Sequence, residues 1–287
     1  AMAQFNLAGC FERGLGVKKD NETTKKSPPN RKELWNSQTV YEEHKNAPTS
    51  TAPKTATLPN GVFVTKKVIK NWRKQVERPG NKIKQIEAAK SLAHCYRTGL
   101  CVDQNDKEAI IFERKAAMLG HKASQYNLSV NYAQGRGVEK NLEISAMWCE
   151  KVAAQGDVHA QFNLGNYFRH GKGVEQNDET AAHWYSKAAA QGHAESQYNL
   201  GHFYMYGKGV EQNYETAAHW CFKAAAQAYA EAECDLGYSF EKGHGVEQNV
   251  ETSAKWYSKA AARGHANAQY NLGSCFYKGS GVKQDHE

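Results

Sequence analysis

Serine and histidine side chains that could support nucleophilic chemistry recur along this 287-residue chain. Ser186 and Ser258 both lie in Trp-Tyr-Ser-Lys segments with a histidine nearby. Because these local sequences are repeated, a serine nucleophile with a histidine base would have to occur several times. The sequence contains no Gly-x-Ser-x-Gly turn, no phosphate-binding glycine loop and no carboxylate pair outside ordinary helix faces. We therefore predict no catalytic residues and no enzyme activity.

Cysteines and histidines are the candidates for disulfides or a metal site. An odd number of cysteines argues against a complete set of disulfides, so we expect buried thiols at positions 10, 95, 101, 149, 221, 234 and 275. Two histidine sets, 183/219 and 121/193/265, advance by repeated steps along the chain. Packed helices lie about 10 Å apart, too far for two such histidines to share zinc at about 2.0 Å per ligand. We interpret them as surface or interhelix hydrogen-bonding groups and predict no metal and no cofactor.

Lysines stand three residues after an aromatic side chain at five regular positions, and we call this set the lysine ladder: Lys115, Lys151, Lys187, Lys223 and Lys259. A row of cations at fixed spacing could meet an acidic or extended peptide. The candidate partner-binding residues are Met147, Lys151, His183, Lys187, His219, Lys223, Lys255 and Lys259. The alternative interpretation of the ladder is an ordinary solvated helix face.

Positive charge is concentrated near the N-terminus. Residues 1–90 carry 18 Lys+Arg and 8 Asp+Glu, whereas residues 91–287 carry 19 and 22. Segment 66–84 holds eight basic residues and one glutamate, with Val68, Ile69, Trp72 and Val76 spaced as a buried helical stripe. Such a surface could bind nucleic acid or an anionic membrane. We favour a solvated basic face, and therefore expect no nucleic-acid or membrane partner.

These side chains are positioned by an internal repeat of 36 residues. The valine that ends a Gly-x-Gly-Val-type turn recurs at positions 102, 138, 174, 210, 246 and 282. An aromatic residue follows ten positions later and a leucine precedes it by ten. A fixed period of this length is the signature of a repeat architecture.

Each period contains two helical patterns, illustrated by residues 179–190 and 194–206. Asn177 can cap the first helix and Gly192 can end it in a left-handed conformation. In the second helix, Ala160, Leu164 and Phe168 form one apolar face. Glycines follow the leucine at positions 165, 201, 237 and 273, which predicts close approach of a neighbouring helix. Two helices cannot bury their apolar faces alone, so we predict an all-α, α/α superhelical solenoid of helix–turn–helix repeats and no sheet.

The pattern AxxYNLGxxYxxGxGVxxN followed by AAxWYxKAAxxGxAxA, over residues 88–282, resembles the Sel-one-like repeat (SLR) family, a relative of the tetratricopeptide repeats. The resemblance implies a right-handed superhelix whose first helices line a concave partner-binding surface. It also implies an adaptor role in signalling, protein quality control or bacterium–host contact. A cysteine-rich branch of the family cross-links the two helices of each unit, but the corresponding positions here are not cysteines, so its disulfides and its penicillin-binding or hydrolase activity remain the disfavoured alternative.

The N-terminal third departs from the period. We divide the chain into an N-terminal partial repeat (1–26), a Pro/Thr-rich loop or disordered insertion (27–61), a degenerate basic repeat (62–101) and a regular solenoid (102–287). The chain begins inside a second-helix pattern and stops five residues after Val282, which indicates a fragment, or uncapped ends that favour self-association.

These patterns together favour a non-catalytic scaffold or adaptor that binds a protein or peptide on the solenoid surface. No apolar stretch is long enough to span a membrane and no secretory signal pattern is present, so we expect a cytoplasmic protein.

Overall fold

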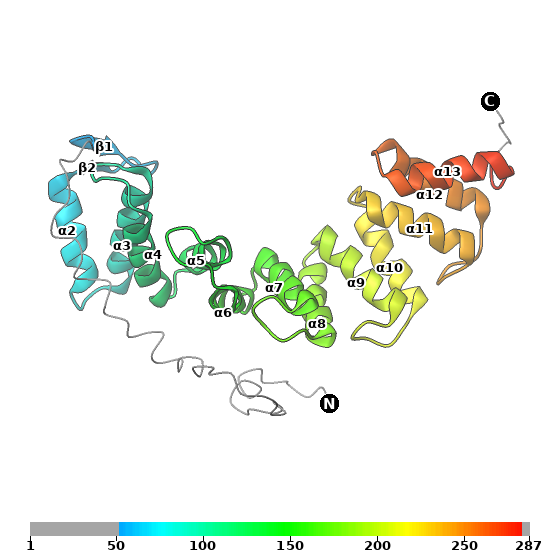
Figure 1. Ribbon diagram of the computed structural model, residues 1–287, viewed down its shortest axis with the longest axis horizontal. Coiled ribbons are helices and arrows are strands. Elements are labelled where there is room, and N and C mark those ends of the chain that lie inside the picture. The colour runs from blue at the N-terminus through cyan, green and yellow to red at the C-terminus, as the bar shows by residue number, and fades with distance from the viewer. Residues whose placement is uncertain (1–51, 283–287) are drawn as a thin grey trace, which may run out of the picture. The chain divides into compact units, whose positions relative to one another are not determined.

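The computed structural model describes residues 52–282, in which a pair of strands is followed by twelve helices (Figure 1). The strands are β1 (Thr55–Thr57) and β2 (Phe63–Thr65). The helices are α2 (Lys66–Glu77), α3 (Lys82–Thr98), α4 (Asp106–Met118), α5 (Lys122–Gln134), α6 (Leu142–Ala153), α7 (Val158–His170), α8 (Asp178–Ala190), α9 (Ala194–Tyr206), α10 (Tyr214–Ala225), α11 (Ala230–Lys242), α12 (Val250–Ala262) and α13 (Ala266–Lys278). The predicted partial repeat 1–26, and residues 27–51 of the predicted loop, lie outside the described part.

Each helix packs on the helices that precede and follow it in the sequence, so packing runs in chain order. We refer to α4, α6, α8, α10 and α12 as first helices and to α3, α5, α7, α9, α11 and α13 as second helices. The most extensive packing joins a second helix to the first helix that follows it, as in α7 with α8. The predicted solenoid of helical repeats is confirmed.

First helices begin at an asparagine that recurs every 36 residues. The Asn177 side chain accepts a hydrogen bond from the amide of Thr180, and Asn105, Asn141, Asn213 and Asn249 cap their helices in the same way. Gly192, after α8, has φ +91°. Both predicted helix-boundary signals are therefore confirmed.

The histidines at 121, 193 and 265, predicted to be surface or interhelix hydrogen-bonding groups, cap the second helices α5, α9 and α13. Nδ1 of His193 accepts from the amide of Ser196 at 3.2 Å, and His121 and His265 act in the same way. Asp157 stands at the same position and caps α7 with its carboxylate. Aspartate is a common N-cap residue, so its presence at a position that is histidine in other repeats indicates that the histidines are caps as well. In α11 the position is Tyr229, which makes no side-chain cap, and the preceding Ala228 has φ +63°.

Glycines within the second helices allow a first-helix side chain to approach. A Cβ added at Gly165 would lie 2.7 Å from the Tyr185 ring, and one at Gly237 would lie 2.5 Å from the Tyr257 ring. Gly201 faces Cys221 at 3.0 Å. The predicted close approach is confirmed at these three glycines and is wrong at Gly273 in α13, where no atom lies within 4 Å.

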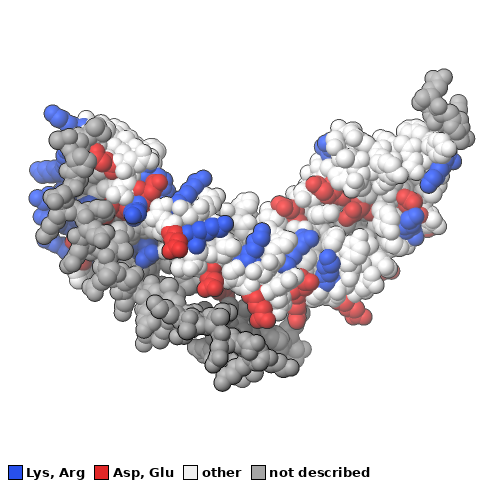
Figure 2. Space-filling view, viewed as in Figure 1, with Lys and Arg blue, Asp and Glu red and all other residues white. Residues whose placement is uncertain are grey.

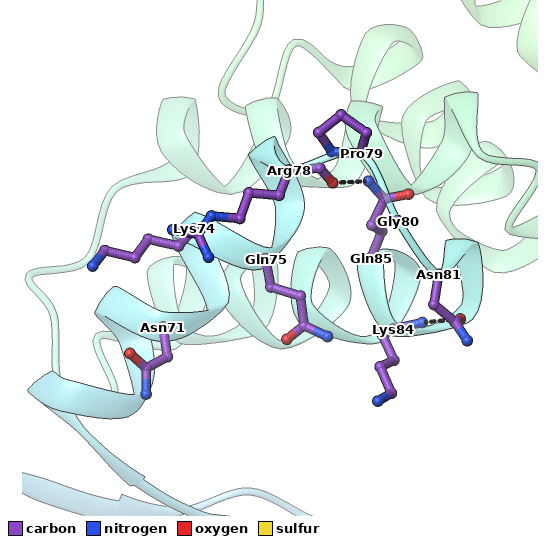
Figure 3. Close-up of a pocket in the computed structure, with 9 residues that line it drawn as sticks. All are labelled: Asn71, Lys74, Gln75, Arg78, Pro79, Gly80, Asn81, Lys84 and Gln85. Carbon is purple, nitrogen blue, oxygen red and sulfur yellow. Dashed lines mark hydrogen bonds between the residues drawn. The ribbon is translucent and has the colours of Figure 1, made fainter.

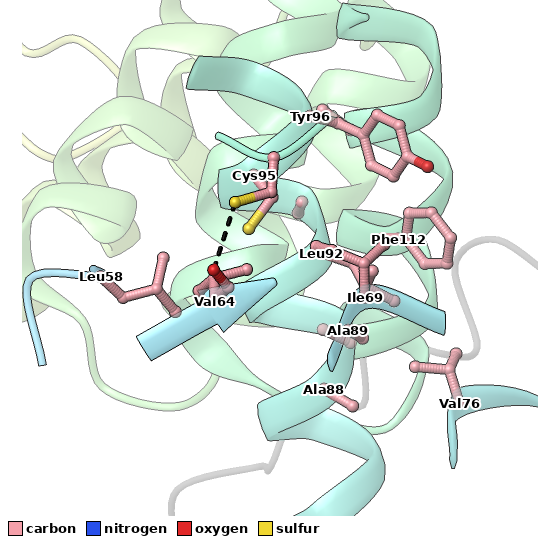
Figure 4. Packing of buried hydrophobic residues seen from close by; sticks show 14 residues of the cluster. Leu58, Val64, Ile69, Val76, Ala88, Ala89, Leu92, Cys95, Tyr96 and Phe112 are labelled. Carbon is pink, nitrogen blue, oxygen red and sulfur yellow. Dashed lines mark hydrogen bonds between the residues drawn. The ribbon is translucent and has the colours of Figure 1, made fainter. Parts of the chain in front are cut away.

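The prediction of no sheet is wrong, because β1 and β2 form a two-stranded sheet. β1 and β2 are antiparallel with Ala56 opposite Val64, so residues 55–57 of the predicted loop form a strand. Val64 is fully buried and its carbonyl accepts from the thiol of Cys101 at 3.3 Å (Figure 4). Strands of three residues have too little pattern to be recognised, and this pair is stabilised by packing on α2 and α3. The predicted apolar stripe of α2 is confirmed, with Ile69 and Val76 buried and Val68 and Trp72 half-buried.

Glutamine pairs join residues thirty positions apart within one unit, where a unit is a second helix and the first helix that follows it. Nε2 of Gln191 donates to Oε1 of Gln161 at 2.7 Å, and pairs 125/155 and 197/227 repeat the contact. In the following unit the pair becomes ionic, because Arg263 Nε lies 3.1 Å from Oε2 of the buried Glu233. In each of these four units, including 158–193 and 230–265, a pair of polar side chains therefore connects the second helix to the end of the first helix that follows it.

The last helix exposes aromatic side chains, and one of them, Tyr270, has half-buried aromatic counterparts at positions 126, 162 and 198 of earlier second helices. Tyr270 is 79% exposed and Tyr277 is 70% exposed in α13. Self-association through such a face stays a prediction.

Candidate functional site

Every lysine of the lysine ladder lies over the aromatic ring three residues before it. The ammonium of Lys187 is 4.6 Å from the centroid of Trp184, and that of Lys223 is 4.5 Å from Trp220. The corresponding distances are 5.8, 5.1 and 3.8 Å for Lys115, Lys151 and Lys259. A cation within about 6 Å of a ring face is attracted to it, so each aromatic side chain holds its lysine in place on the helix. The ladder is therefore a row of partly ordered cations on successive first helices.

Three of the other predicted site residues are exposed, and the fourth is half-buried. His183 and His219 are exposed and meet the edge of the adjacent tryptophan, at 5.5 and 5.6 Å between ring centroids. Loss of hydration beside the neighbouring side chains, and then the charge of Lys187, lower the pKa of His183, so the imidazole is neutral near pH 7. Lys255 is exposed, whereas Met147 is half-buried against the cluster of Ile110, Leu128 and Trp148.

The cysteines in the described part of the chain are free thiols. Five of them are buried, and Cys275 is half-buried. Burial raises the pKa of Cys149 and Cys221 to about 12 and that of Cys95 and Cys234 to about 11. Because the thiolate is the nucleophilic form, these groups are protonated and unreactive at neutral pH.

A basic pocket of about 360 Å³ lies between α2 and α3 (Figure 3). Its charged side chains are Lys74, Arg78 and Lys84, and the other lining residues are Asn71, Gln75, Pro79, Gly80, Asn81 and Gln85. Gln85 Nε2 donates to the carbonyl of Arg78 at 2.7 Å and so ties the two helices together. No acidic residue lines the pocket, and Lys and Arg side chains gather at this end of the described chain (Figure 2).

Arg73, on the same helix, is oriented differently from the pocket residues. Its guanidinium contacts the hydroxyl of Tyr96 and lies 3.3 Å from Oε2 of Glu108. It also covers the rings of Tyr96 and Phe112 at 5.3 and 5.6 Å. Arg73 therefore contributes to packing between α2, α3 and α4, whereas Lys74 and Arg78 face the pocket.

Within residues 52–282, no helix is both long and apolar enough to cross a membrane. In the same residues, no group of three or more His, Cys, Asp or Glu side chains is placed to hold a metal ion. The predicted cytoplasmic location stays a prediction.

Comparison with known proteins gives a family and a fold. The Sel1 repeat family model matches residues 1–24, 86–121, 122–157, 158–193, 194–229, 230–265 and 266–287. The structure is similar to that of c5321, a protective antigen of uropathogenic Escherichia coli with an SLR fold, at 32% identity and a TM-score of 0.64. The match covers 76% of this chain and 45% of the antigen, so this chain corresponds to less than half of that protein.

A second similar structure is a Sel1 repeat protein from Oxalobacter formigenes, at 25% identity and a TM-score of 0.58, covering 76% of this chain and 90% of that one. None of the curated proteins matches the chain. The family model spans well over half of the sequence, and each of its units from residue 86 to residue 265 contains one second helix, or most of it, and the first helix that follows. The chain belongs to the Sel1 repeat family.

Proposed function

We propose that this chain is a non-catalytic scaffold that binds an acidic segment of a partner protein along the lysine ladder. The observation that carries the proposal is the exposed lysine held over an aromatic ring at the same place in successive first helices. Cations that are already ordered lose less side-chain entropy on binding than free lysines do. The candidate residues remain Met147, Lys151, His183, Lys187, His219, Lys223, Lys255 and Lys259.

Charge reversal at two adjacent positions of the ladder tests this proposal. The double variant Lys187→Glu/Lys223→Glu should bind a fluorescein-labelled decapeptide of alternating Glu and Gly at least about tenfold more weakly than the wild type, because two attractive contacts become repulsive. Fluorescence anisotropy at 50 mM salt measures the affinity.

The matched control is Lys172→Glu/Lys208→Glu, which changes the net charge equally at two exposed lysines of the Gly-x-Gly-Val turns. This control should bind within about twofold of the wild type. Equal weakening by both double variants would show that only net charge matters and would contradict the ladder as a site. Thermal unfolding of all variants confirms that the helices are intact.

We also propose a second function, anion binding by the basic pocket between α2 and α3, which is favoured by its three cations and its lack of acidic lining residues. Lys74→Glu/Arg78→Glu should abolish binding to a single-stranded oligonucleotide or to phosphatidylserine vesicles at 50 mM salt, and wild-type binding should fall steeply by 200 mM salt. Fluorescence anisotropy measures binding to the oligonucleotide, and co-sedimentation measures binding to the vesicles, across this salt range. Binding that is absent, or flat with salt, would end the proposal.

A further inference from the structure

A polar pair recurs between second helices that are one unit apart. In α7 and α9, Nη1 of Arg169 donates to Oδ1 of Asn199 at 3.0 Å, and the guanidinium lies 5.8 Å from the centroid of Phe203. Two units earlier, Arg97 and Asn127 stand at the same positions and both contact Glu113. In both places an asparagine stands thirty residues after the arginine. Arg169 contacts its asparagine directly, whereas Arg97 and its asparagine are bridged by Glu113.

One unit after Arg169 and Asn199, the equivalent residues are Met205 and Asp235. Asparagine stands at this second position at 127, 163, 199 and 271, and serine at 91. Arginine is also absent at Ala133 and Glu241, where the second position remains asparagine, so the carboxylate is particular to the pair formed by Met205 and Asp235. Asp235 is half-buried, and no residue from 52 to 282 forms a hydrogen bond or ion pair with its carboxylate. Burial and then the charge of Glu231 raise its pKa to about 6, as expected for a carboxylate without a cation.

Exposed tyrosine rings lie on the same two helices as Met205 and Asp235. Tyr238 is 41% exposed and stands three residues after Asp235, on the same side of α11. Tyr206 is 59% exposed and directly follows Met205 at the end of α9. Burial, followed by the charges of Asp235, Tyr238 and Tyr214, raises the pKa of Tyr206. Tyr238 also meets the edge of His244, with 5.6 Å between ring centroids.

A buried hydroxyl in α11 also lacks a partner. Ser239 lies one turn beyond Asp235, at the position that corresponds to Phe203. It is fully buried, and its Oγ has no hydrogen-bond partner among the described residues. In the preceding unit, the guanidinium of Arg169 covers that position. In the unit that carries Met205, a carboxylate and a buried hydroxyl thus both lack a hydrogen-bond partner among the described residues.

We propose that Asp235, with Tyr206 and Tyr238, binds an arginine side chain of a basic segment in a partner protein. A guanidinium can donate two parallel hydrogen bonds to a carboxylate and stack on tyrosine at the same time, which an ammonium cannot do. Met205, which is flexible, can adjust to the incoming group. The proposal rests on the proposed function as a protein-binding scaffold, but it uses the second helices and not the lysine ladder.

The test uses a fluorescein-labelled decapeptide of alternating Gly and Arg, and the same peptide with the neutral analogue citrulline in place of arginine. The wild type should bind the arginine peptide at least about tenfold more tightly than the citrulline peptide. Asp235→Asn, which restores the asparagine of the other repeats, should lower the affinity at least about tenfold. Met205→Arg should do the same, because an internal guanidinium would then occupy Asp235.

Two controls separate this inference from the lysine ladder. Lys187→Glu/Lys223→Glu should leave affinity for the arginine peptide within about twofold of the wild type, and circular dichroism should show unchanged helix content in every variant. The proposal is overturned if the wild type does not prefer arginine over citrulline, or if Asp235→Asn binds as tightly as the wild type. If the acidic peptide still depends on Lys187 and Lys223 in that case, the scaffold function stands and only the arginine site is lost.

Discussion

Replacing Gly209 with alanine is expected to destabilise the chain by about 3 kcal/mol or more. Gly209 is the second glycine of a Gly-x-Gly-Val turn and has φ +61°. An added Cβ would lie 2.2 Å from the carbonyl carbon of Asp178 and 2.3 Å from the amide nitrogen of Glu179. Both atoms belong to the first turn of α8, which Asn177 caps, so relief of the clash requires that turn to shift.

The control for this substitution is Gly207→Ala in the same turn. Gly207 has φ +63°, but the atom nearest its added Cβ would be Cβ of Gln212 at 3.4 Å, and the backbone atoms of Gln212 and Val210 would lie at 3.6 and 3.7 Å, in ordinary contact. Both variants bear the cost of a left-handed alanine, about 1 kcal/mol, and only Gly209→Ala adds a backbone clash. Urea unfolding followed by circular dichroism measures the difference, and hydrogen exchange should show the loss first in α8. Equal losses in the two variants would contradict the close contact.

Replacing Gly237 with alanine should also destabilise the chain, by about 1 to 2 kcal/mol. The added Cβ would lie 2.5 Å from Cδ1 of Tyr257, which is fully buried and donates a hydrogen bond to Glu241 at 3.0 Å. Overpacking of this kind costs about 1 to 3 kcal/mol, and the better helix propensity of alanine returns up to about 1 kcal/mol.

The same substitution at Gly273 should have the opposite sign. Gly273 occupies the equivalent position in α13, where no atom lies within 4 Å of an added Cβ. Gly273→Ala should therefore stabilise the chain by up to about 1 kcal/mol through helix propensity alone. Urea midpoints of the two variants compared with the wild type provide the measurement. If both changes move the midpoint in the same direction, packing against Tyr257 does not explain Gly237.

Much of the repeat fold was predictable because it depends on short-range patterns. The expected helices 179–190 and 194–206 differ from α8 and α9 by one residue at one end. Asn177 and Gly192 mark boundaries through hydrogen bonds and dihedral angles within a few residues of themselves, so a single repeat contains the necessary information.

Features that depend on contacts between elements were harder to predict. The strands β1 and β2 are too short to show alternation and depend on the burial of Val64. The cap role of His193 required comparison with Asp157 in another repeat.

The site was predicted only as a row of positions. The spacing placed Lys187 three residues after Trp184, but it did not show that the ring holds the ammonium. Asp235 was not singled out, because its character comes from Met205, thirty residues earlier and on another helix. Differences between repeats, compared column by column, were the signal that could have found it.

The polar pairs that close the units have a consequence for how such a chain can change in length. Gln161 and Gln191 belong to the same unit, as do Glu233 and Arg263, and none of these four pairs crosses the joints after residues 157, 193 or 229. Other hydrogen bonds, such as that from Arg169 to Asn199, do cross a joint. A duplication or excision of 36 residues made at those joints would leave both members of each of the four pairs present. Whole modules can therefore be gained or lost without stranding a buried glutamine or glutamate, which gives a physical basis for growth of the array by unit steps.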